Sequence, residues 1–368
     1  MEFRIAAEEL HKALHRAQGI AERKTTIPIL ANVLMNAKKT GVSLTAFDLD
    51  IGLVSEHPAE VTKEGAITLS AKHLFDIVRA LPDSKVTIRR TTNNAVELES
   101  GNARFKLLGM AAEEYPALPK EEKSSLVKAD GKTLLEMIQK THFAISSDET
   151  RYILNGLYFE PGDKGAVRAV ATDGHRLSMV ERQMEGDFKL KKGVIIPRKG
   201  LMELKRLLEE APDAECYLGF GDTSAIFKKA GLSMVMRLID GQFPDYQEVI
   251  PKEGDKAIKL NRTRLQETLK RISLLSEEKS HAVRLALEPN MLKISSQNPD
   301  LGEASEALEV EYSGKKIEVG FNARYLIDVL GVVNTEDVSF EISDEQSPGV
   351  LRPAGEKSYT AVIMPMRI

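Results

Sequence analysis

The sequence has almost no cysteine, no tryptophan and no long apolar run, and these absences exclude several classes of protein. The single cysteine, Cys216, excludes an internal disulfide framework and any zinc or iron–sulfur site built from several cysteines. The apolar runs are too short to span a bilayer, and the opening Met-Glu-Phe-Arg-Ile lacks the basic and apolar regions of a secretory signal. We therefore expect a protein of the reducing cytoplasm.

A surplus of one charge is also lacking. Over 368 residues, 51 Lys and Arg stand against 55 Asp and Glu, so the net charge of −4 gives no overall case for nucleic-acid binding. The 42% hydrophobic and 29% charged content is typical of globular proteins. The length exceeds one average domain, which predicts two or three domains.

One sequence unit recurs six times along the chain. Each copy has a polar lead-in, a helix anchored by a leucine and several strands, and the copies follow at intervals of 64, 60, 67, 64 and 61 residues. Units this short bury little surface, so we expect them to pair into three domains, 1–120, 121–248 and 249–368. Proline-bounded segments at 114–119 and 243–251 mark the two boundaries. The anchoring leucines are Leu10, Leu74, Leu134, Leu201, Leu265 and Leu326.

The patterning predicts an α+β fold, with one helix against an antiparallel sheet in each unit. Apolar and polar residues alternate at 86–89, 95–98, 105–107 and 292–294, which is typical of strands with one buried face. A doubly wound parallel sheet would need a helix between nearly every pair of strands, and the sequence lacks them. The predicted helices cover 8–23, 71–81, 130–142, 197–210, 261–272 and 322–332.

Positive charge is concentrated on these helices. They hold 16 Lys and Arg against 11 Asp and Glu, whereas the rest of the chain holds 35 against 44. Solvated helix faces explain this as readily as a surface for phosphates does, because Lys and Arg are good helix formers. No base-stacking or recognition-helix motif accompanies the charge, so a DNA contact would be to the backbone. The excess is strongest at Arg198, Lys199, Lys205, Arg206, Arg262, Arg264, Lys270 and Arg271.

Asp173, His175 and Ser178 suggest a hydrolase, because these residue types form catalytic triads. All three fall on one short segment, however, in which Asp173-Gly174 predicts a turn between strands. A triad needs side chains that converge from separate elements. A turn or a recognition surface is therefore the favoured interpretation.

Other candidate sites are weaker still. His11 and His15 have the spacing of metal ligands on a helix but no third ligand is evident. Asp48 and Asp50 suit either acid–base chemistry or a strand-end turn, and Cys216 suits a buried strand. Neither phosphate-binding glycine motif occurs, so we expect no cofactor, no metal and no catalytic site.

The C-terminal residues 361–368 stay apolar to the end, where chains usually become polar. The first half suits a last sheet strand, and Pro365 ends it. Met364 and Met366 suit an adaptable peptide-binding surface as well as a core. Either interpretation is open on these residues alone.

Several longer motifs carry a resemblance to a known family. Over its whole length the chain resembles the bacterial sliding clamps, the beta subunits of DNA polymerase III. The matching motifs, in order, are Thr-Ile-Pro-Ile-Leu (26–30), Arg-Tyr-Ile-Leu-Asn-Gly (151–156), Ala-Thr-Asp-Gly-His-Arg-Leu (171–177), Ile-Pro-Arg-Lys-Gly (196–200), Gly-Gln-Phe-Pro-Asp-Tyr (241–246), Gly-Phe-Asn-Ala-Arg-Tyr-Leu (320–326) and Met-Pro-Met-Arg-Ile (364–368).

The resemblance implies a non-enzymatic processivity factor that encircles duplex DNA as a head-to-tail homodimer of six domains. Helices would line the hole and contact DNA independently of sequence, and the protein would associate with the nucleoid during replication. Lys24, Lys72 and Tyr152 match DNA-contacting positions, whereas Asp148 and Ile153 stand where relatives carry a polar and an aromatic residue. The helix charge adds the candidate DNA contacts Arg198, Lys199, Arg262 and Arg264.

The resemblance also implies a groove between domains 2 and 3 that binds short motifs of the polymerase, the clamp loader, other DNA polymerases and repair proteins. Glu248 stands where some relatives carry a basic residue. The dimer would place Phe105 and Leu107 against the partner's Leu274 and Leu275. The positions that match the groove are Leu154, Thr172, Gly174, His175, Arg176, Leu177, Pro244, Val249, Asn322, Tyr325, Val362, Met364, Pro365, Met366 and Arg367.

Two other functions stay open at the level of sequence. A hydrolase would lose turnover when His175 is replaced, whereas a clamp would lose partner affinity and still dimerise. A DNA-bound structural protein without a ring would leave circular and linear DNA alike as salt rises.

Overall fold

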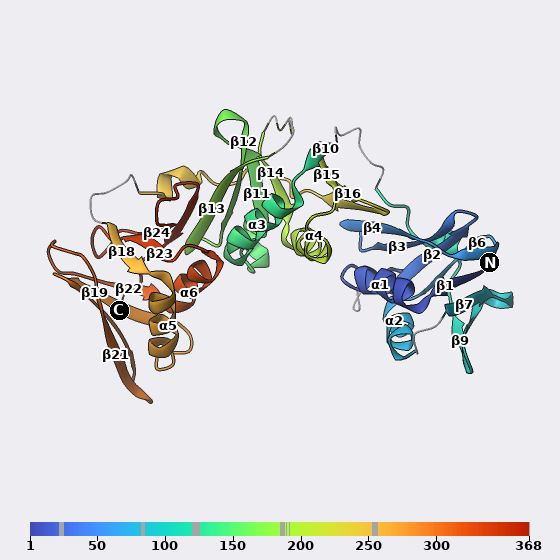
Figure 1. Ribbon diagram of the computed structural model, residues 1–368, viewed down its shortest axis with the longest axis horizontal. Helices are drawn as coiled ribbons and strands as arrows, with labels where there is room; N and C mark the ends of the chain where they lie inside the picture. The colour runs from blue at the N-terminus through green and yellow to red at the C-terminus, as the bar shows by residue number, and fades with distance from the viewer. Residues whose placement is uncertain are drawn as a thin grey trace. The chain divides into compact units, whose positions relative to one another are not determined.

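The computed structural model describes residues 1–21, 26–81, 85–119, 126–184, 188, 190, 192–251 and 257–367 (Figure 1). The chain forms two compact units, each described by itself. Unit 1 comprises residues 1–132, 185–189 and 202–238, and unit 2 comprises residues 133–184, 190–201 and 239–368.

Six α-helices occur in the described part of the chain, one in each sequence unit. Side-chain caps begin several of them: Ser70 accepts from the amide of His73, and Asn261 accepts from the amide of Arg264. The first helix ends at Gln18, earlier than the predicted residue 23. The helices are α1 (Ala7–Gln18), α2 (Ala71–Ala80), α3 (Gly131–Thr141), α4 (Arg198–Glu210), α5 (Arg262–Ser273) and α6 (Ala323–Val332).

Unit 1 holds two antiparallel sheets. The larger has the order β10 (Val127–Ala129), β15 (Cys216–Phe220), β16 (Ser224–Lys229), β17 (Leu232–Arg237), β4 (Ile51–His57), β3 (Gly41–Phe47), β2 (Asn32–Lys38), β6 (Gly65–Ser70). The smaller has the order β5 (Glu60–Lys63), β1 (Glu2–Ala6), β7 (Lys85–Arg90), β8 (Ala95–Ser100), β9 (Ala103–Leu108). The pairing of β4 with β17 joins strands almost 180 residues apart in the sequence, with Ile51 opposite Met236.

Unit 2 repeats this plan. Its larger sheet has the order β14 (Val194–Pro197), β11 (Gly156–Pro161), β12 (Ala166–Thr172), β13 (Arg176–Gln183), β25 (Tyr359–Ile363), β24 (Gly349–Pro353), β23 (Asp337–Glu341), β18 (Ala257–Asn261). Its smaller sheet has the order β21 (Gly302–Glu309), β20 (Met291–Asn298), β19 (Ala282–Glu288), β22 (Ile317–Asn322). Here β13 pairs with β25, and Leu177 lies opposite Val362.

The helices cover the sheets in pairs. In unit 1, α1 and α2 pack on each other and against β2, β3, β4 and β6, and in unit 2, α5 packs on α6 and on β19, β20 and β21 (Figure 1). Leu10, Leu14 and Leu74 bury the apolar face of the first pair, and Leu265 and Leu269 that of the second.

The α+β prediction is confirmed, and the four strand segments expected from alternation lie in β7, β8, β9 and β20. The sequence predicted that each of the six sequence units forms its own sheet. This prediction was incomplete, because each eight-stranded sheet combines strands from two distant stretches of sequence. Within the described residues, no helix has the length and apolar character that crossing a membrane requires.

Candidate functional site

A mainly apolar pocket of about 160 Å³ opens in unit 2, where the β12–β13 turn, the short helix η7 (Tyr246–Val249) and the end of β25 meet. Val249 and Met364 stand partly exposed at its edge, and Leu177 and Val362 are buried in its wall. Its lining residues are Leu154, Thr172, Gly174, Arg176, Leu177, Pro244, Asp245, Tyr246, Val249, Val362 and Met364.

The turn that forms one wall is fixed by its own backbone. The carboxylate of Asp173 accepts hydrogen bonds from the amides of His175 (2.9 Å) and Arg176 (3.0 Å). Gly174 has φ +86°, a conformation that costs glycine little. Asp173-Gly174 therefore forms the turn that the sequence predicted.

Arg176 holds this wall against α6. Its guanidinium bonds Asp173 (3.0 Å), Asp328 (2.6 Å) and the carbonyl of Phe143 (2.5 Å), and it stacks on the ring of Tyr325 at 4.3 Å. Burial raises the pKa of the Tyr325 phenol, so that this group stays neutral. The guanidinium is engaged on several sides, so Arg176 positions the wall.

The pocket floor is a packed apolar cluster. Leu154, Leu177 and Val362 are buried in it, and Phe243 stacks in parallel on Tyr158 with ring centroids 4.7 Å apart. A pocket with an apolar floor and a few polar groups at its edge suits the apolar side chains of a short peptide.

The chain end forms a second surface next to the pocket. The amide of Met364 donates to the carbonyl of His175 (2.9 Å), and that of Met366 donates to Gly320 (2.8 Å). Pro365, Met366 and Arg367 line a wider, polar hollow of about 710 Å³.

The residues predicted to form the groove therefore lie in different places. Nine of them line the apolar pocket and three line the polar hollow. Asn322 instead caps α6, Tyr325 stacks on Arg176, and the backbone of His175 holds the tail. Two lining residues were not singled out, Asp245 and Tyr246, although both belong to the quoted motif of 241–246.

The candidate DNA contacts differ in how exposed they are. Lys72 on α2, Arg198 and Lys199 at the start of α4, and Arg264 on α5 are exposed, and the side chain of Tyr152 is 59% exposed. Lys24 lies outside the described residues. Arg262 is half-buried, because its guanidinium donates to the carbonyl of Leu330 (3.2 Å) and so caps α6.

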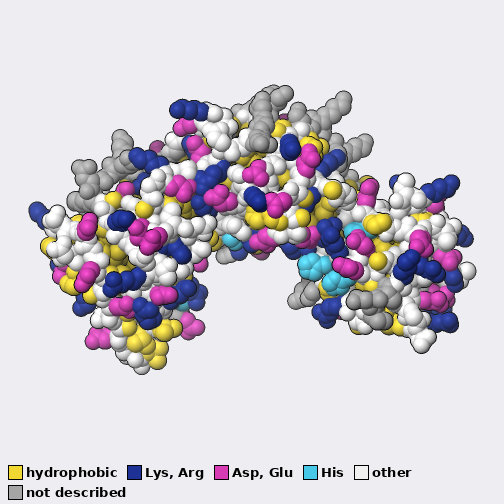
Figure 2. Space-filling model, in the orientation of Figure 1, with side chains coloured by type: hydrophobic (Ala, Val, Ile, Leu, Met, Phe, Trp, Pro, Cys, Tyr) yellow, Lys and Arg dark blue, Asp and Glu magenta, His cyan; other side chains and the backbone are white. Residues whose placement is uncertain are grey.

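Carboxylates neutralise part of the helix charge. Arg206 pairs with Glu203 (2.6 Å), and Arg271 pairs with Glu306 (2.7 Å). On the face drawn in Figure 2, Lys and Arg alternate with Asp and Glu. The basic helices are thus less basic than their sequence suggests.

The dimer candidates lie on an edge strand, β9, and in the turn after α5. Phe105 and Leu107 are half-buried on the edge strand β9, and the next residue, Leu108, is 83% exposed. Leu275 is half-buried after α5, whereas Leu274 is 77% exposed. Leu108 was not predicted, because strand alternation assigned only 105–107.

The residues that suggested a catalytic site form structural contacts. Ser178 is buried, and its hydroxyl donates to the carbonyl of Lys140 (2.5 Å), while Asp173 pairs with Arg176. The carboxylate of Asp48 accepts from the amides of Asp50 and Ile51, which forms a turn.

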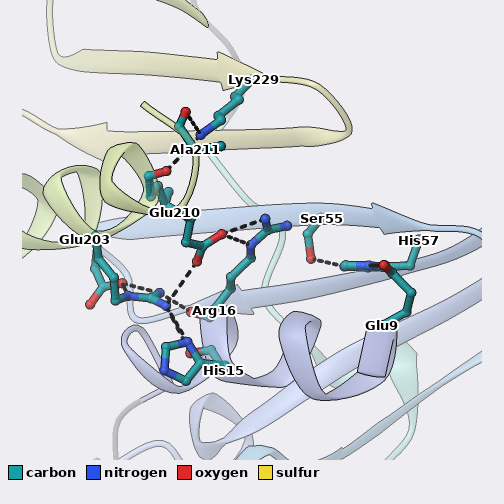
Figure 3. Close-up of polar contacts among 11 residues, drawn as sticks. Glu9, His15, Arg16, Ser55, His57, Glu203, Glu210, Ala211 and Lys229 are labelled. Atoms are coloured by element: carbon teal, nitrogen blue, oxygen red, sulfur yellow. Dashed lines mark hydrogen bonds and ion pairs between the residues drawn. The ribbon is translucent and has the colours of Figure 1, made fainter. Parts of the chain in front are cut away.

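His15, one of the two helix histidines, belongs to a polar network in unit 1 (Figure 3). His15 bonds Arg206 (3.0 Å), Arg16 bonds Glu210 (2.7 Å), and His11 stacks on Phe75 at 4.9 Å. No group of three metal-binding side chains occurs in the described part of the chain. This network ties α1 to α4, and it forms no metal centre.

Comparison with known proteins covers the whole chain. Residues 1–119, 128–245 and 247–367 match the N-terminal, central and C-terminal domains of the family DNA polymerase III beta subunit. The beta sliding clamp of Pseudomonas aeruginosa is 37% identical over 369 residues, covering 100% of both chains. The solved structures of the Pseudomonas aeruginosa and Bartonella birtlesii sliding clamps bound to griselimycin are 37% and 35% identical, with TM-scores of 0.92 and 0.96 and full coverage of both chains.

Proposed function

The chain belongs to the DNA polymerase III beta subunit family, and from that premise we propose which of its surfaces hold partner peptides, DNA and the second protomer. The protein is a sliding clamp. Its ring-shaped homodimer encircles duplex DNA, tethers the replicative polymerase and serves as a docking platform for the clamp loader, other polymerases and repair proteins. It is a processivity factor and has no catalytic role. We place it in the cytoplasm, at the nucleoid during replication.

We assign partner binding to the apolar pocket of unit 2. The observation that carries this assignment is that nine of the residues expected in the groove line one pocket, although they come from four stretches of sequence. Tail residues Pro365, Met366 and Arg367 extend the surface into the polar hollow. Glu248 is exposed beside the pocket, so a basic residue next to the peptide's apolar anchors would be favoured.

We assign DNA contact to the exposed residues Lys72, Tyr152, Arg198, Lys199 and Arg264. Phosphate contacts of this kind do not depend on sequence and leave the clamp free to slide. Arg262 acts chiefly as a helix cap, and its charge adds to the local field. The proposed domains are 1–120, 121–248 and 249–368, a division that the matched family ranges support.

We assign dimerisation to strand β9 of one protomer and strand β21 of the other. Both are unpaired sheet edges, and edge strands readily add a strand from another chain. Inside the chain, β4 pairs with β17 and β13 with β25, so joining β9 to β21 would repeat the same sheet-to-sheet plan. Phe105, Leu107, Leu274 and Leu275 would then lose contact with water.

Release of the clamp from a cut DNA circle tests this function. A bacterial clamp loader and ATP would place the protein on nicked circular DNA, and high salt would then remove proteins held by charge alone. We expect retention on the intact circle and release after a single cut by a restriction enzyme, as measured by gel filtration of labelled protein.

The uncut circle, carried through the same steps, is the control. Retention on the cut DNA would mean that direct contacts hold the protein, and the non-ring alternative would replace the clamp. Loss of the protein from both the cut and the uncut DNA in high salt would also favour the non-ring alternative.

A further inference from the structure

We propose that three charged residues behind the pocket, Glu160, Arg168 and Glu181, keep the pocket open by holding the hydroxyl of Tyr246. We call these three residues the charged ladder. The proposal rests on the function assigned to the pocket above. It makes Arg168 and Tyr246 positioning residues for partner binding, although Arg168 does not line the pocket.

The charged ladder crosses three neighbouring strands. Glu160 on β11 lies opposite Arg168 on β12, which lies opposite Glu181 on β13. The Arg168 guanidinium donates two hydrogen bonds to Glu181 (2.9 and 2.6 Å) and one to Glu160 (3.3 Å). All three side chains are at most 25% exposed, so solvent weakens these pairs less than it weakens surface pairs.

Tyr246 joins this ladder to the pocket. Its ring is buried in the pocket floor and is one of the lining groups. Its hydroxyl donates a short hydrogen bond to Glu160 and accepts one from Arg168 (3.0 Å). Burial and the hydrogen bond to Glu160 raise the pKa of Tyr246 to about 12, so the phenol stays a proton donor at neutral pH. The ring is thus fixed at its far end by two charged partners.

Unit 1 contains three corresponding strands, but these strands lack the charged ladder. Strands β2, β3 and β4 repeat the order and register of β11, β12 and β13, and Asn36 lies opposite Ser43, which lies opposite Glu56. The turn after β3 also repeats, because Asp48 caps it as Asp173 caps the turn after β12. Asn36 and Ser43 therefore occupy the places of Glu160 and Arg168.

In this repeat the place of Tyr246 is taken by Leu118. The segments Tyr115-Pro116-Ala117-Leu118 and Phe243-Pro244-Asp245-Tyr246 correspond residue by residue. Leu118 packs against Leu30 and Phe47, and its Cδ2 lies 2.6 Å from where a Cβ on Gly52 would be. Gly52 holds the register position of Leu177. The side chain of Leu118 therefore lies where the Leu177 side chain lies in unit 2.

The two repeats differ at Gly52 and Leu177 as well as at Leu118 and Tyr246, and the hydroxyl group explains the different path of the Tyr246 ring. A leucine has no polar end, so nothing prevents it from packing into the apolar hollow below it. A tyrosine at the same position is drawn to the sheet surface, because its hydroxyl gains two charged partners there. The ring then stays in the pocket floor and leaves the pocket empty for a ligand.

A double-mutant cycle tests the proposal, with griselimycin as the probe. Calorimetric titration would measure its dissociation constant for the dimeric protein and for the variants Tyr246→Phe, Arg168→Met and the double variant. We expect each single change to weaken binding about five- to tenfold, the effect of losing one or two hydrogen bonds. The double variant should bind griselimycin no more weakly than the single variant with the larger loss, because both changes remove the hydrogen bonding of the same hydroxyl. Arg168→Lys, which retains the charge but not the paired hydrogen bonds, should fall between wild type and Arg168→Met.

Arg352→Met is the matched control. Arg352 pairs with Glu341 (2.6 Å) in the same sheet and is similarly buried, and it hydrogen-bonds Glu341 and Thr360, neither of which lines the pocket. Its dissociation constant should stay within about twofold of wild type. Multiplicative losses in the double variant, unchanged binding by Tyr246→Phe, or an equal loss in Arg352→Met would overturn the role of the ladder. Failure of the wild-type protein to bind griselimycin would instead overturn the pocket assignment, and this proposal with it.

Discussion

At the scale of single residues, the buried charges of this chain serve structure. Lys140 is buried almost completely, yet it pairs with Glu136 (2.8 Å) and lies over the ring of Tyr359. Arg182 bonds Glu136 (2.6 Å) and Glu356 (2.7 Å). This group joins α3 and β13 to the turn before β25, and each charge in it has a partner, which is the condition for burying charges at tolerable cost.

Glu136→Gln tests the energetics of that group. Burial by itself raises the pKa of Glu136, but hydrogen bonds from Arg182 and Lys140 outweigh it and lower the pKa to about 2. The ionised form therefore stabilises the fold above pH 4.5, and the contribution is lost as pH falls toward 2. Because about a third of this side chain reaches solvent, we expect a Tm lower by only about 2–4 °C at pH 7.

Thermal unfolding followed by circular dichroism between pH 7 and pH 3 would measure this difference. It should shrink below pH 4.5. Glu149→Gln is the control, because Glu149 is exposed and forms no ion pair with another described residue. A difference between Glu136→Gln and wild type that does not change with pH would contradict the ionic explanation.

The sequence predicted local features of the site and missed those that depend on distant partners. The Asp173-Gly174 turn was predictable because its hydrogen bonds stay within four residues. The contact of Arg176 with Asp328 joins residues 152 positions apart, and no local pattern signals it. Assigning Asp173 and His175 to a binding surface therefore depended on the resemblance.

At the scale of elements, helices were predicted closely and sheets only in part. An amphipathic face and a cap define a helix within its own sequence, so α2 and α5 begin within one residue of expectation. The sharing of a sheet by β4 and β17, or by β13 and β25, is set by packing between distant segments. Alternation identifies a strand but does not identify its neighbour.

Leu274→Asp tests the proposed joining of sheet edges. A carboxylate at a buried contact between protomers would be strongly unfavourable, so we expect a monomer of 40.7 kDa where the wild type is a dimer. Light scattering after size-exclusion chromatography would measure the mass. The pocket of unit 2 should keep its affinity for a partner peptide, because all of its lining residues lie within one chain.

Leu49→Asp is the control, because it makes the same change at an exposed leucine outside the proposed interface. Leu49 is exposed and has φ +80°, a conformation that aspartate adopts more easily than leucine does. This variant should stay dimeric. A dimeric Leu274→Asp protein would remove α5 and its following turn from the interface.

At the scale of the whole molecule, charge placement matters more than net charge. The net charge is −4, and many helix cations are neutralised by nearby carboxylates, as Arg206 and Arg271 are. Lys72, Arg264 and Lys270 are exposed and form no ion pair with other described residues. A few such cations suffice for a protein that is retained by enclosure and needs only weak, sequence-independent contacts.

Reversal of two free cations tests this view. The variant Lys72→Glu with Arg264→Glu should be loaded on DNA roughly tenfold more slowly at low salt, because attraction of the DNA phosphates is lost. The loading rate with clamp loader and ATP would be measured by fluorescence. Lys293→Glu, an exposed change on a sheet strand, should load normally. Equal slowing by Lys293→Glu would mean that total charge is what matters.

The two open sheet edges carry opposite charges, and this has a consequence for self-assembly. Strand β9 presents Arg104 and Lys106, whereas β21 presents Glu303 and Glu309. Two copies of β9, or two of β21, would bring like charges together, and only unlike edges attract. In the proposed dimer, these charges favour joining β9 to β21 over the mispaired sheets from which aggregates grow.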